Sequence, residues 1–295
     1  MIQEQDEVIL TRFEAALIHD GLASSTVVNY LTDLHLFLRW GQAESGGEFS
    51  LSQATQEHIR LYRYYLTHTL KQAVSTVNRR LMALRKFFAF AKDFDAIAVN
   101  PTVGVALVQS NGQAYSRPLT GDETESLLEA ATNGSRAGLV RRDVAILQLL
   151  LHTGLRVNEL INLQRDDLIF DNPGLRLRVS SDQDDKVRYL PLCSEVYKAL
   201  NDYLAMRPQT TTAQHLFLNQ QGQPISDRTV QRIISDCARS ARLTGVSAQS
   251  LRRTFALQLL AETNDLELVS ARLGHQNSAI TAQYLAVHEK LENRD

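Results

Sequence analysis

The chain has 295 residues, of which 44% are hydrophobic and 22% are charged, and its formal net charge is −2. These values are typical of a globular protein with two hydrophobic cores, and they exclude a uniformly basic nucleic-acid-binding surface. No apolar run reaches the ~20 residues of a membrane span, and the acidic N-terminus does not resemble a secretory signal, so we expect a cytoplasmic protein. Cys193 and Cys237 lie far apart in the sequence, which argues against a disulfide framework or a zinc site.

The first hundred residues show helical periodicity, and apolar residues such as Leu17, Leu34 and Leu84 are the expected core positions. The predicted helices span about residues 5–20, 24–40, 55–70 and 75–92. Four helices with short joints form a small helical domain, which we place at residues 1–99. Asn100-Pro101 and the aperiodic segment after it predict a linker at residues 100–117.

Positive charge is concentrated around the last of these helices. Residues 71–92 contain no acidic residue, and their six cations are Lys71, Arg79, Arg80, Arg85, Lys86 and Lys92. Such a run is often only a solvated helix face, but within an acidic chain it favours a surface that faces phosphates. The candidates for nucleic-acid contact are Lys71, Ser75, Thr76, Asn78, Arg79, Arg80 and Lys86. Arg85 is expected instead to pack its stem along the core.

Residues 118–295 predict a mixed domain. Thr120 and Glu123 form a capping-box pattern that opens a helix at residues 121–132. Three short strands, joined by turns, are expected at residues 168–170, 175–179 and 187–192. Further helices are expected at about residues 140–151, 156–163, 194–206, 226–243, 249–262, 265–273 and 278–290. The fold class is therefore mainly α with a small antiparallel β-sheet in the second domain.

Three stretches of the second domain contain residues suited to metal-free cleavage of a phosphodiester. That reaction needs a nucleophile, cationic donors for the non-bridging oxygens and an acid for the leaving oxygen. Arginine suits the donor role because its planar fork makes paired hydrogen bonds and keeps its charge. The stretches are Thr153–Leu160 with Arg156, Ser250–Ala256 with Arg252, and Leu273-Gly274-His275 followed nine residues later by Tyr284.

Each stretch alone is a weak signal, because a helix-start arginine is commonly a surface residue and a tyrosine in an apolar helix is commonly a core residue. Together and in this order, T-G-L-R-x-x-E-L, then L-R-x-T-F-A, then L-G-H before T-x-x-Y, the sequence resembles the tyrosine recombinase (phage integrase) family. The similarity is to its two-domain Xer-like members and covers nearly the whole chain. It implies a helical core-binding domain followed by a catalytic domain.

The resemblance implies a role for each matching residue. Arg156 and Arg252 would bind the scissile phosphate, and His275 would donate a hydrogen bond to it. Tyr284 would attack the phosphorus, leaving a 3′-phosphotyrosine and a free 5′ hydroxyl, without a metal, ATP or another cofactor. The implied partners are double-stranded DNA with a specific core site and further protomers, because family members act as homo- or hetero-tetramers on DNA.

The sequence departs from the family pattern at two positions. Gln249 stands where the family usually has histidine, so a hydrogen bond could remain there but proton transfer could not. Gln183 aligns with the lysine of the β-hairpin that acts as the general acid, and Lys186 aligns with a second lysine. Because hairpins shift register when their turn length changes, we expect Lys186 to protonate the leaving oxygen.

Alternatives remain at this point. Arg228 and Arg232 open the helix at 226–243 and are further candidates for DNA contact, although a structural role fits them equally well. The two departures favour a catalytically impaired relative that binds DNA as an architectural protein, whereas the intact set of Arg156, Arg252, His275 and Tyr284 favours an active recombinase. A relaxase that resembles type IB topoisomerases would share the same chemistry.

Overall fold

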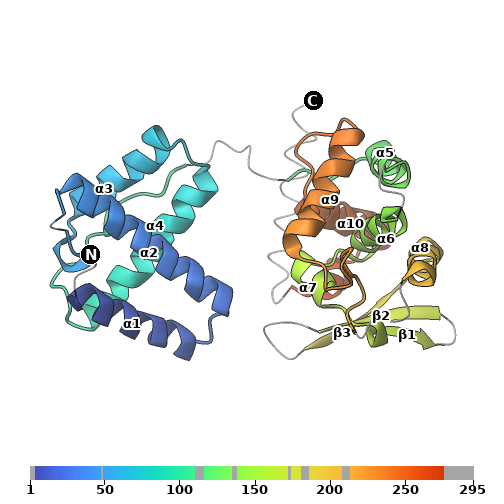
Figure 1. Ribbon diagram of the computed structural model, residues 1–295, viewed down its shortest axis with the longest axis horizontal. Coiled ribbons are helices and arrows are strands. Elements are labelled where there is room, and N and C mark those ends of the chain that lie inside the picture. Colours follow the sequence, from blue (N-terminus) through green and yellow to red (C-terminus); the bar gives the residue numbers. More distant parts are fainter. Residues whose placement is uncertain are drawn as a thin grey trace. The chain divides into compact units, whose positions relative to one another are not determined.

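The computed structural model describes residues 4–47, 49–109, 116–134, 138–171, 174–180, 186–207 and 213–275 (Figure 1). The chain divides into two compact units, Met1–Tyr115 and Ser116–Asp295. Within the described ranges, none of the helices combines the length and the apolar character that crossing a membrane requires. The helix predicted at 278–290 lies outside the described residues.

The described residues of the first unit form four α-helices, as the sequence predicts (Figure 1). Their bounds are α1 Glu4–His19, α2 Ser24–Glu44, α3 Gln56–Tyr64 and α4 Val74–Asp93, with a short 3₁₀ turn at Leu51–Gln53. The third predicted helix is not uniform, because a π-helical segment, Tyr65–Thr69, continues α3. The core is rich in aromatic rings. The centroid of the Phe37 ring lies 5.0 Å from that of the Tyr62 ring and 5.5 Å from that of the Phe49 ring.

The segment after Pro101, as far as it is described, packs against α3 and α4 of the first unit. Arg63 and Arg85 donate hydrogen bonds to the carbonyl oxygens of Ala106 and Val105, at 2.7 and 2.6 Å. Asn78 uses both ends of its amide on the backbone of Val108, at 2.8 and 2.9 Å. Side chains of α3 and α4 therefore satisfy backbone groups that would otherwise need water.

The second unit places helices above one face of a small sheet (Figure 1). The helices are α5 Gly121–Thr132, α6 Val140–Thr153, α7 Val157–Asn162, α8 Ser194–Met206, α9 Asp227–Ser240, α10 Ala248–Thr263 and α11 Leu266–Leu273. The antiparallel strands β1 Leu168–Asp171, β2 Gly174–Ser180 and β3 Val187–Pro191 are ordered β1-β2-β3. Buried and exposed residues alternate along β2, so its inner face, which includes Leu177 and Val179, contributes to the core. The predicted fold class is confirmed.

The beginning of the second unit is attached to α10 by three hydrogen bonds. The Ser116 carbonyl accepts one from Arg253 at 2.7 Å, and the Ser116 hydroxyl accepts one from Ser247 at 3.1 Å. The backbone N–H of Leu119 donates to the Thr254 hydroxyl at 2.8 Å. Residues 116–119 are thus fixed on the helix that carries Arg252.

Candidate active site

The turn between α6 and α7 places a backbone carbonyl and Arg156 at the centre of the site. Gly154 ends α6 with φ +61°, in the left-handed region that favours glycine. A Cβ atom there would lie 2.5 Å from the Phe255 ring and 2.8 Å from the Leu273 side chain, so the close approach of α10 and α11 also requires glycine. Arg156 follows as the N-cap of α7, and its side chain is about half exposed.

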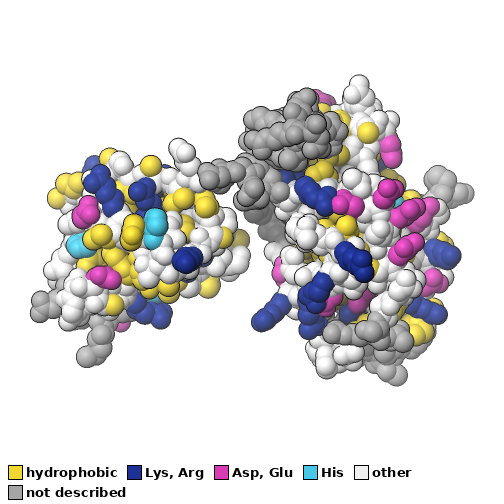
Figure 2. Space-filling view, turned by 90° about the horizontal axis from the view of Figure 1, so that it is seen from above, with side chains coloured by type: hydrophobic (Ala, Val, Ile, Leu, Met, Phe, Trp, Pro, Cys, Tyr) yellow, Lys and Arg dark blue, Asp and Glu magenta, His cyan; other side chains and the backbone are white. Residues whose placement is uncertain are grey.

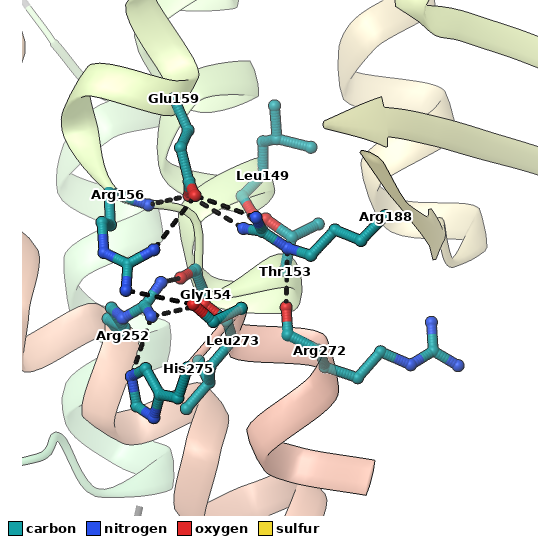
Figure 3. Close-up of polar contacts among 11 residues, drawn as sticks. Leu149, Thr153, Gly154, Arg156, Glu159, Arg188, Arg252, Arg272, Leu273 and His275 are labelled. Carbon is teal, nitrogen blue, oxygen red and sulfur yellow. Dashed lines mark hydrogen bonds and ion pairs between the residues drawn. The ribbon is translucent and has the colours of Figure 1, made fainter. Parts of the chain in front are cut away.

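Arg252 enters the site from α10 and is 3% exposed (Figure 3). Its guanidinium donates hydrogen bonds to the carbonyl oxygen of Gly154 and, at 2.6 Å, to that of Leu273. It also lies 3.0 Å from Nε2 of His275. Hydrogen bonds donated to carbonyl oxygens orient a guanidinium without cancelling its charge, which is what binding of a phosphate requires.

His275 follows Gly274, which ends α11 in the left-handed conformation with φ +64°. Because a guanidinium only donates hydrogen bonds, the contact with Arg252 makes Nε2 the acceptor, and the neutral ring then carries its proton on Nδ1. Burial, and next the charge of Arg252, lowers the pKa of His275 to about 4. Arg156 and Arg188 act in the same direction. At neutral pH this imidazole is therefore a neutral hydrogen-bond donor.

Glu159 lies in the first turn of α7 and joins two arginines (Figure 3). The guanidinium of Arg188 on β3 donates to both carboxylate oxygens of Glu159 at 2.9 Å. The guanidinium of Arg156 donates to the same carboxylate at 3.2 Å, and the backbone N–H of Arg156 donates to it at 2.7 Å. Burial raises the pKa of the Glu159 carboxyl, but the hydrogen bonds and charges of Arg188 and Arg156 outweigh burial, so the net pKa lies below its usual range. Glu159 is therefore ionised at neutral pH and orients Arg156.

The structure brings together three of the residues that the sequence nominates, Arg156, Arg252 and His275. Besides the contact between Arg252 and His275, Arg156 donates a hydrogen bond of 3.3 Å to the carbonyl oxygen of Gly274. The proposed nucleophile, Tyr284, lies outside the described residues, as does Gln183. Their positions relative to the three residues stay a prediction.

Lys186 and Gln249 lie at the borders of elements that contribute to the site. Lys186 is exposed and directly precedes β3, two residues before Arg188. Gln249 is exposed in the first turn of α10, three residues before Arg252, which places it on the same side of the helix. Their chemical roles stay predictions as well.

Sequence reasoning missed one member of the site, Arg188. Its guanidinium fills the space between Glu159 and the end of α11, where it donates through Nε to the Arg272 carbonyl at 3.1 Å. The hairpin pattern of the family does contain an arginine at this position. Because Glu159 lies 29 residues earlier in the chain, no local sequence pattern indicates that the two residues meet.

Acidic residues from other parts of the first unit accompany its cations. Asp33 of α2 is 1% exposed, and its carboxylate lies 2.5 Å from Arg79 and 3.6 Å from Arg80. Lys86 lies 3.3 Å from Asp20, and both side chains are about half exposed. The charge run is thus unopposed only along its own segment. On the face of the first unit in view in Figure 2, basic side chains are interspersed with hydrophobic and acidic ones.

The other candidates for DNA contact lie near the start of α4 and on α9. Lys71 is exposed just before α4, and Ser75 is exposed in its first turn, where Thr76 is partly buried. The amide of Asn78 is occupied by Val108. Arg228 and Arg232 are exposed on the first turns of α9. Whether these side chains contact DNA stays a prediction.

The arrangement around Gly154 suits an enzyme that binds a phosphodiester: two arginines and an imidazole meet at a turn, and a carboxylate orients one of the arginines. Among the described residues no group of histidine, cysteine, aspartate or glutamate is placed to hold a metal ion.

Comparison with known proteins identifies the family. Residues 117–290 match the phage integrase family, and residues 10–93 match the phage integrase N-terminal SAM-like domain. The chain therefore belongs to the phage integrase family of tyrosine recombinases, as its motifs predict.

Individual relatives agree with this assignment, and solved structures share the fold. Tyrosine recombinase XerC of Staphylococcus haemolyticus is 31% identical over 96% of this chain and 93% of its own length. The XerC of Thermodesulfovibrio yellowstonii is 31% identical over 92% of this chain and 89% of its own length. The fold is similar to that of the Tn1549 transposon integrase in complex with circular intermediate DNA, with a TM-score of 0.74, 20% identity and 94% coverage of both chains. XerH bound to its difH substrate gives a TM-score of 0.71 with 21% identity, over 91% of this chain and 78% of the other.

Proposed function

We propose that this chain is a site-specific DNA recombinase that cleaves and rejoins DNA strands through a 3′-phosphotyrosyl intermediate. The observation that carries the proposal is the meeting of Arg156, Arg252 and His275 around the Gly154 turn. The three residues come from separate stretches of the sequence, and each can donate a hydrogen bond to a phosphate oxygen. A stability role alone does not require a buried Arg252 and a half-exposed Arg156 to converge on one turn.

In the proposed reaction, the Tyr284 phenolic oxygen attacks the scissile phosphorus and loses its proton. The bond from phosphorus to the 5′ oxygen breaks, and that oxygen leaves as a hydroxyl after taking up a proton. Arg156 and Arg252 stabilise the negative charge that builds on the non-bridging oxygens. The phosphotyrosyl ester conserves the bond energy, so a 5′ hydroxyl of another strand can reverse the attack without ATP.

Strand geometry supports Lys186 as the donor of the leaving-group proton. Residues two apart on a strand point to the same face, so Lys186 is expected on the face that carries Arg188, provided the extended conformation of β3 continues to it. Arg188 pairs with Val179 of β2 and faces the site. The same alternation places Val187 on the opposite face, where it is exposed.

The proposed partner is double-stranded DNA with a specific core site, contacted by cations of both units. Solved DNA complexes of the Tn1549 integrase and XerH, which share this fold, support DNA as the partner. A homo- or hetero-tetramer on two DNA sites and a cytoplasmic location, where such DNA lies, belong to the same proposal.

Covalent trapping on a nicked suicide substrate tests the chemistry. The wild-type protein is expected to form a covalent adduct with DNA, because the cleaved 5′ segment diffuses away and prevents religation. Tyr284→Phe is expected to abolish the adduct, since it removes the attacking oxygen. Gln249→Ala is expected only to reduce the rate of adduct formation, because a glutamine can supply a hydrogen bond but no proton. Adduct formed by Tyr284→Phe would disprove the assignment.

The same experiment separates the two candidate functions. A wild-type protein that binds its site but never forms an adduct would be the architectural protein considered above. Relaxation of supercoiled plasmid without a specific site would instead indicate a relaxase.

A further inference from the structure

Arg188 is the charged residue of the site to which the chemistry above gives no task. We propose that Arg188 is a positioning residue for DNA cleavage, which holds β3, the Arg156 turn and the His275 turn in one fixed arrangement. The inference rests on the proposed function and adds to it a residue that does not itself touch the reacting phosphate.

The contacts of Arg188 use the whole guanidinium group. Both terminal nitrogens bind the Glu159 carboxylate at 2.9 Å, and Nε binds the Arg272 carbonyl at 3.1 Å (Figure 3). A bidentate pair between arginine and carboxylate fixes direction as well as distance. Because the Arg188 side chain is 16% exposed and that of Glu159 only 5%, water screens the pair little.

The end of α11 is shaped around this side chain. A Cβ atom at Gly274 would lie 2.8 Å from a terminal nitrogen of Arg188 and 3.1 Å from its central carbon. The absence of a side chain at Gly274 therefore lets the guanidinium lie directly against the turn that carries His275. Glycine at this position allows the close approach, and its positive φ favours glycine as well.

Arg188 thus connects three groups of the proposed reaction. Through Glu159 it fixes the carboxylate that orients Arg156, and through the Arg272 carbonyl it fixes the backbone three residues before His275. Its own backbone belongs to β3, directly after Lys186 and Val187. Loss of Arg188 would leave Glu159 with a single cation and would release β3 from the turn.

Two substitutions separate the charge of Arg188 from its geometry. Arg188→Gln removes both the charge and the fork, whereas Arg188→Lys keeps the charge and loses the fork. We expect both variants of the full chain to form covalent adduct roughly 10²-fold more slowly in single turnover at saturating DNA, because misplacement by about 1 Å costs that much. Affinity for the DNA site is expected to stay at the wild-type value, since Arg188 does not contact DNA in this proposal.

The titration of His275 provides a second readout, because it reports whether the charge of Arg188 lies beside the imidazole. The charged groups around it are Arg252 of α10, Arg156 at the α7 N-terminus, Arg188 of β3 and Glu159 of α7. In DNA-free protein, followed by NMR of the labelled imidazole, the pKa of His275 should rise from about 4 toward its usual value in Arg188→Gln. It should stay low in Arg188→Lys.

Arg178→Gln is the matched control. Arg178 lies on β2 of the same sheet, pairs with Asp167 at 2.8 Å, and points to the opposite face, where its side chain is 44% exposed. Its substitution is expected to change neither the cleavage rate nor the titration of His275.

The outcomes are distinct. Wild-type adduct formation by folded Arg188→Gln would overturn the proposal. The proposal would also be overturned if the lower cleavage rate were explained by a lower melting temperature and the pKa of His275 did not change. If the wild-type protein forms no adduct on any site, the proposed function fails. The arrangement around Arg188 is tested separately: if the pKa of His275 in Arg188→Gln equals that of the wild-type protein, the arrangement is wrong.

Discussion

The two units hold their arginines in different ways. In the first unit, Arg79 and Arg80 share the buried carboxylate of Asp33, so an acidic group accompanies the positive charge. In the second unit, Arg252 is more deeply buried and is oriented by carbonyl oxygens and by an imidazole. Contacts of the first kind fix helices against each other, whereas contacts of the second kind also leave positive charge available to a phosphate.

The density of positive charge along a sequence is therefore a poor guide to whether that charge binds DNA or stabilises the fold. The charge run of α4 is the most conspicuous in the sequence, yet part of it serves to join α4 to α2. The cations of the candidate active site come from positions far apart in the chain, and none of them belongs to a local run. Three experiments, ordered by the size of the expected effect, test this contrast.

Arg252→Lys is expected to give the largest change. Lysine keeps the charge but cannot reach two carbonyl oxygens and a phosphate with a planar fork, so the rate of adduct formation should fall roughly 10²- to 10³-fold. The measurement is single-turnover cleavage of a suicide substrate, with Arg239→Lys, an exposed residue near the end of α9, as the control. Cleavage at the wild-type rate would show that the site does not depend on how Arg252 is held.

Asp33→Asn is expected to act on stability. It leaves Arg79 and the largely buried Arg80 without their shared carboxylate, which should lower the free energy of unfolding of the first unit by about 1–3 kcal/mol. Trp40 is the only tryptophan of the chain and lies on α2, so its fluorescence during urea unfolding reports on this unit. An unchanged midpoint would mean that the buried carboxylate contributes no net stability.

Lys86→Gln should have the smallest effect. Its pair with Asp20 is exposed, and such pairs contribute about 0–1 kcal/mol, so unfolding should hardly change. If Lys86 contacts a phosphate, the slope of log affinity against log salt concentration should decrease by about 0.9. A slope equal to that of the wild-type protein would remove Lys86 from the proposed DNA surface.

Much of the fold could be predicted because its signals are local. The Thr120 side chain accepts a hydrogen bond from the Glu123 backbone, and the Glu123 side chain accepts one from the Thr120 backbone, as the capping pattern indicates. Gly154 ends α6 in the left-handed conformation that glycine permits. The π-helical segment Tyr65–Thr69 could not be predicted, since the apolar positions of α3 continue through it without a break.

Contacts between distant parts of the chain were beyond sequence reasoning. Nothing near Arg79 indicates Asp33, which lies 46 residues earlier, and nothing near Arg188 indicates Glu159. The meeting of Arg252 with His275 was expected only through the family resemblance. Periodicity and capping predict single elements, whereas the site depends on how the ends of four elements converge.

The hydrogen bonds at residues 116–119 bear on how this protein can be divided for experiments. A fragment that begins at Thr120 would retain every helix and strand of the catalytic unit but would lose the partners of Arg253 and Thr254 on α10. Those two residues directly follow Arg252 in the chain. The functional boundary of a catalytic fragment therefore lies at or before Ser116, several residues ahead of its first helix.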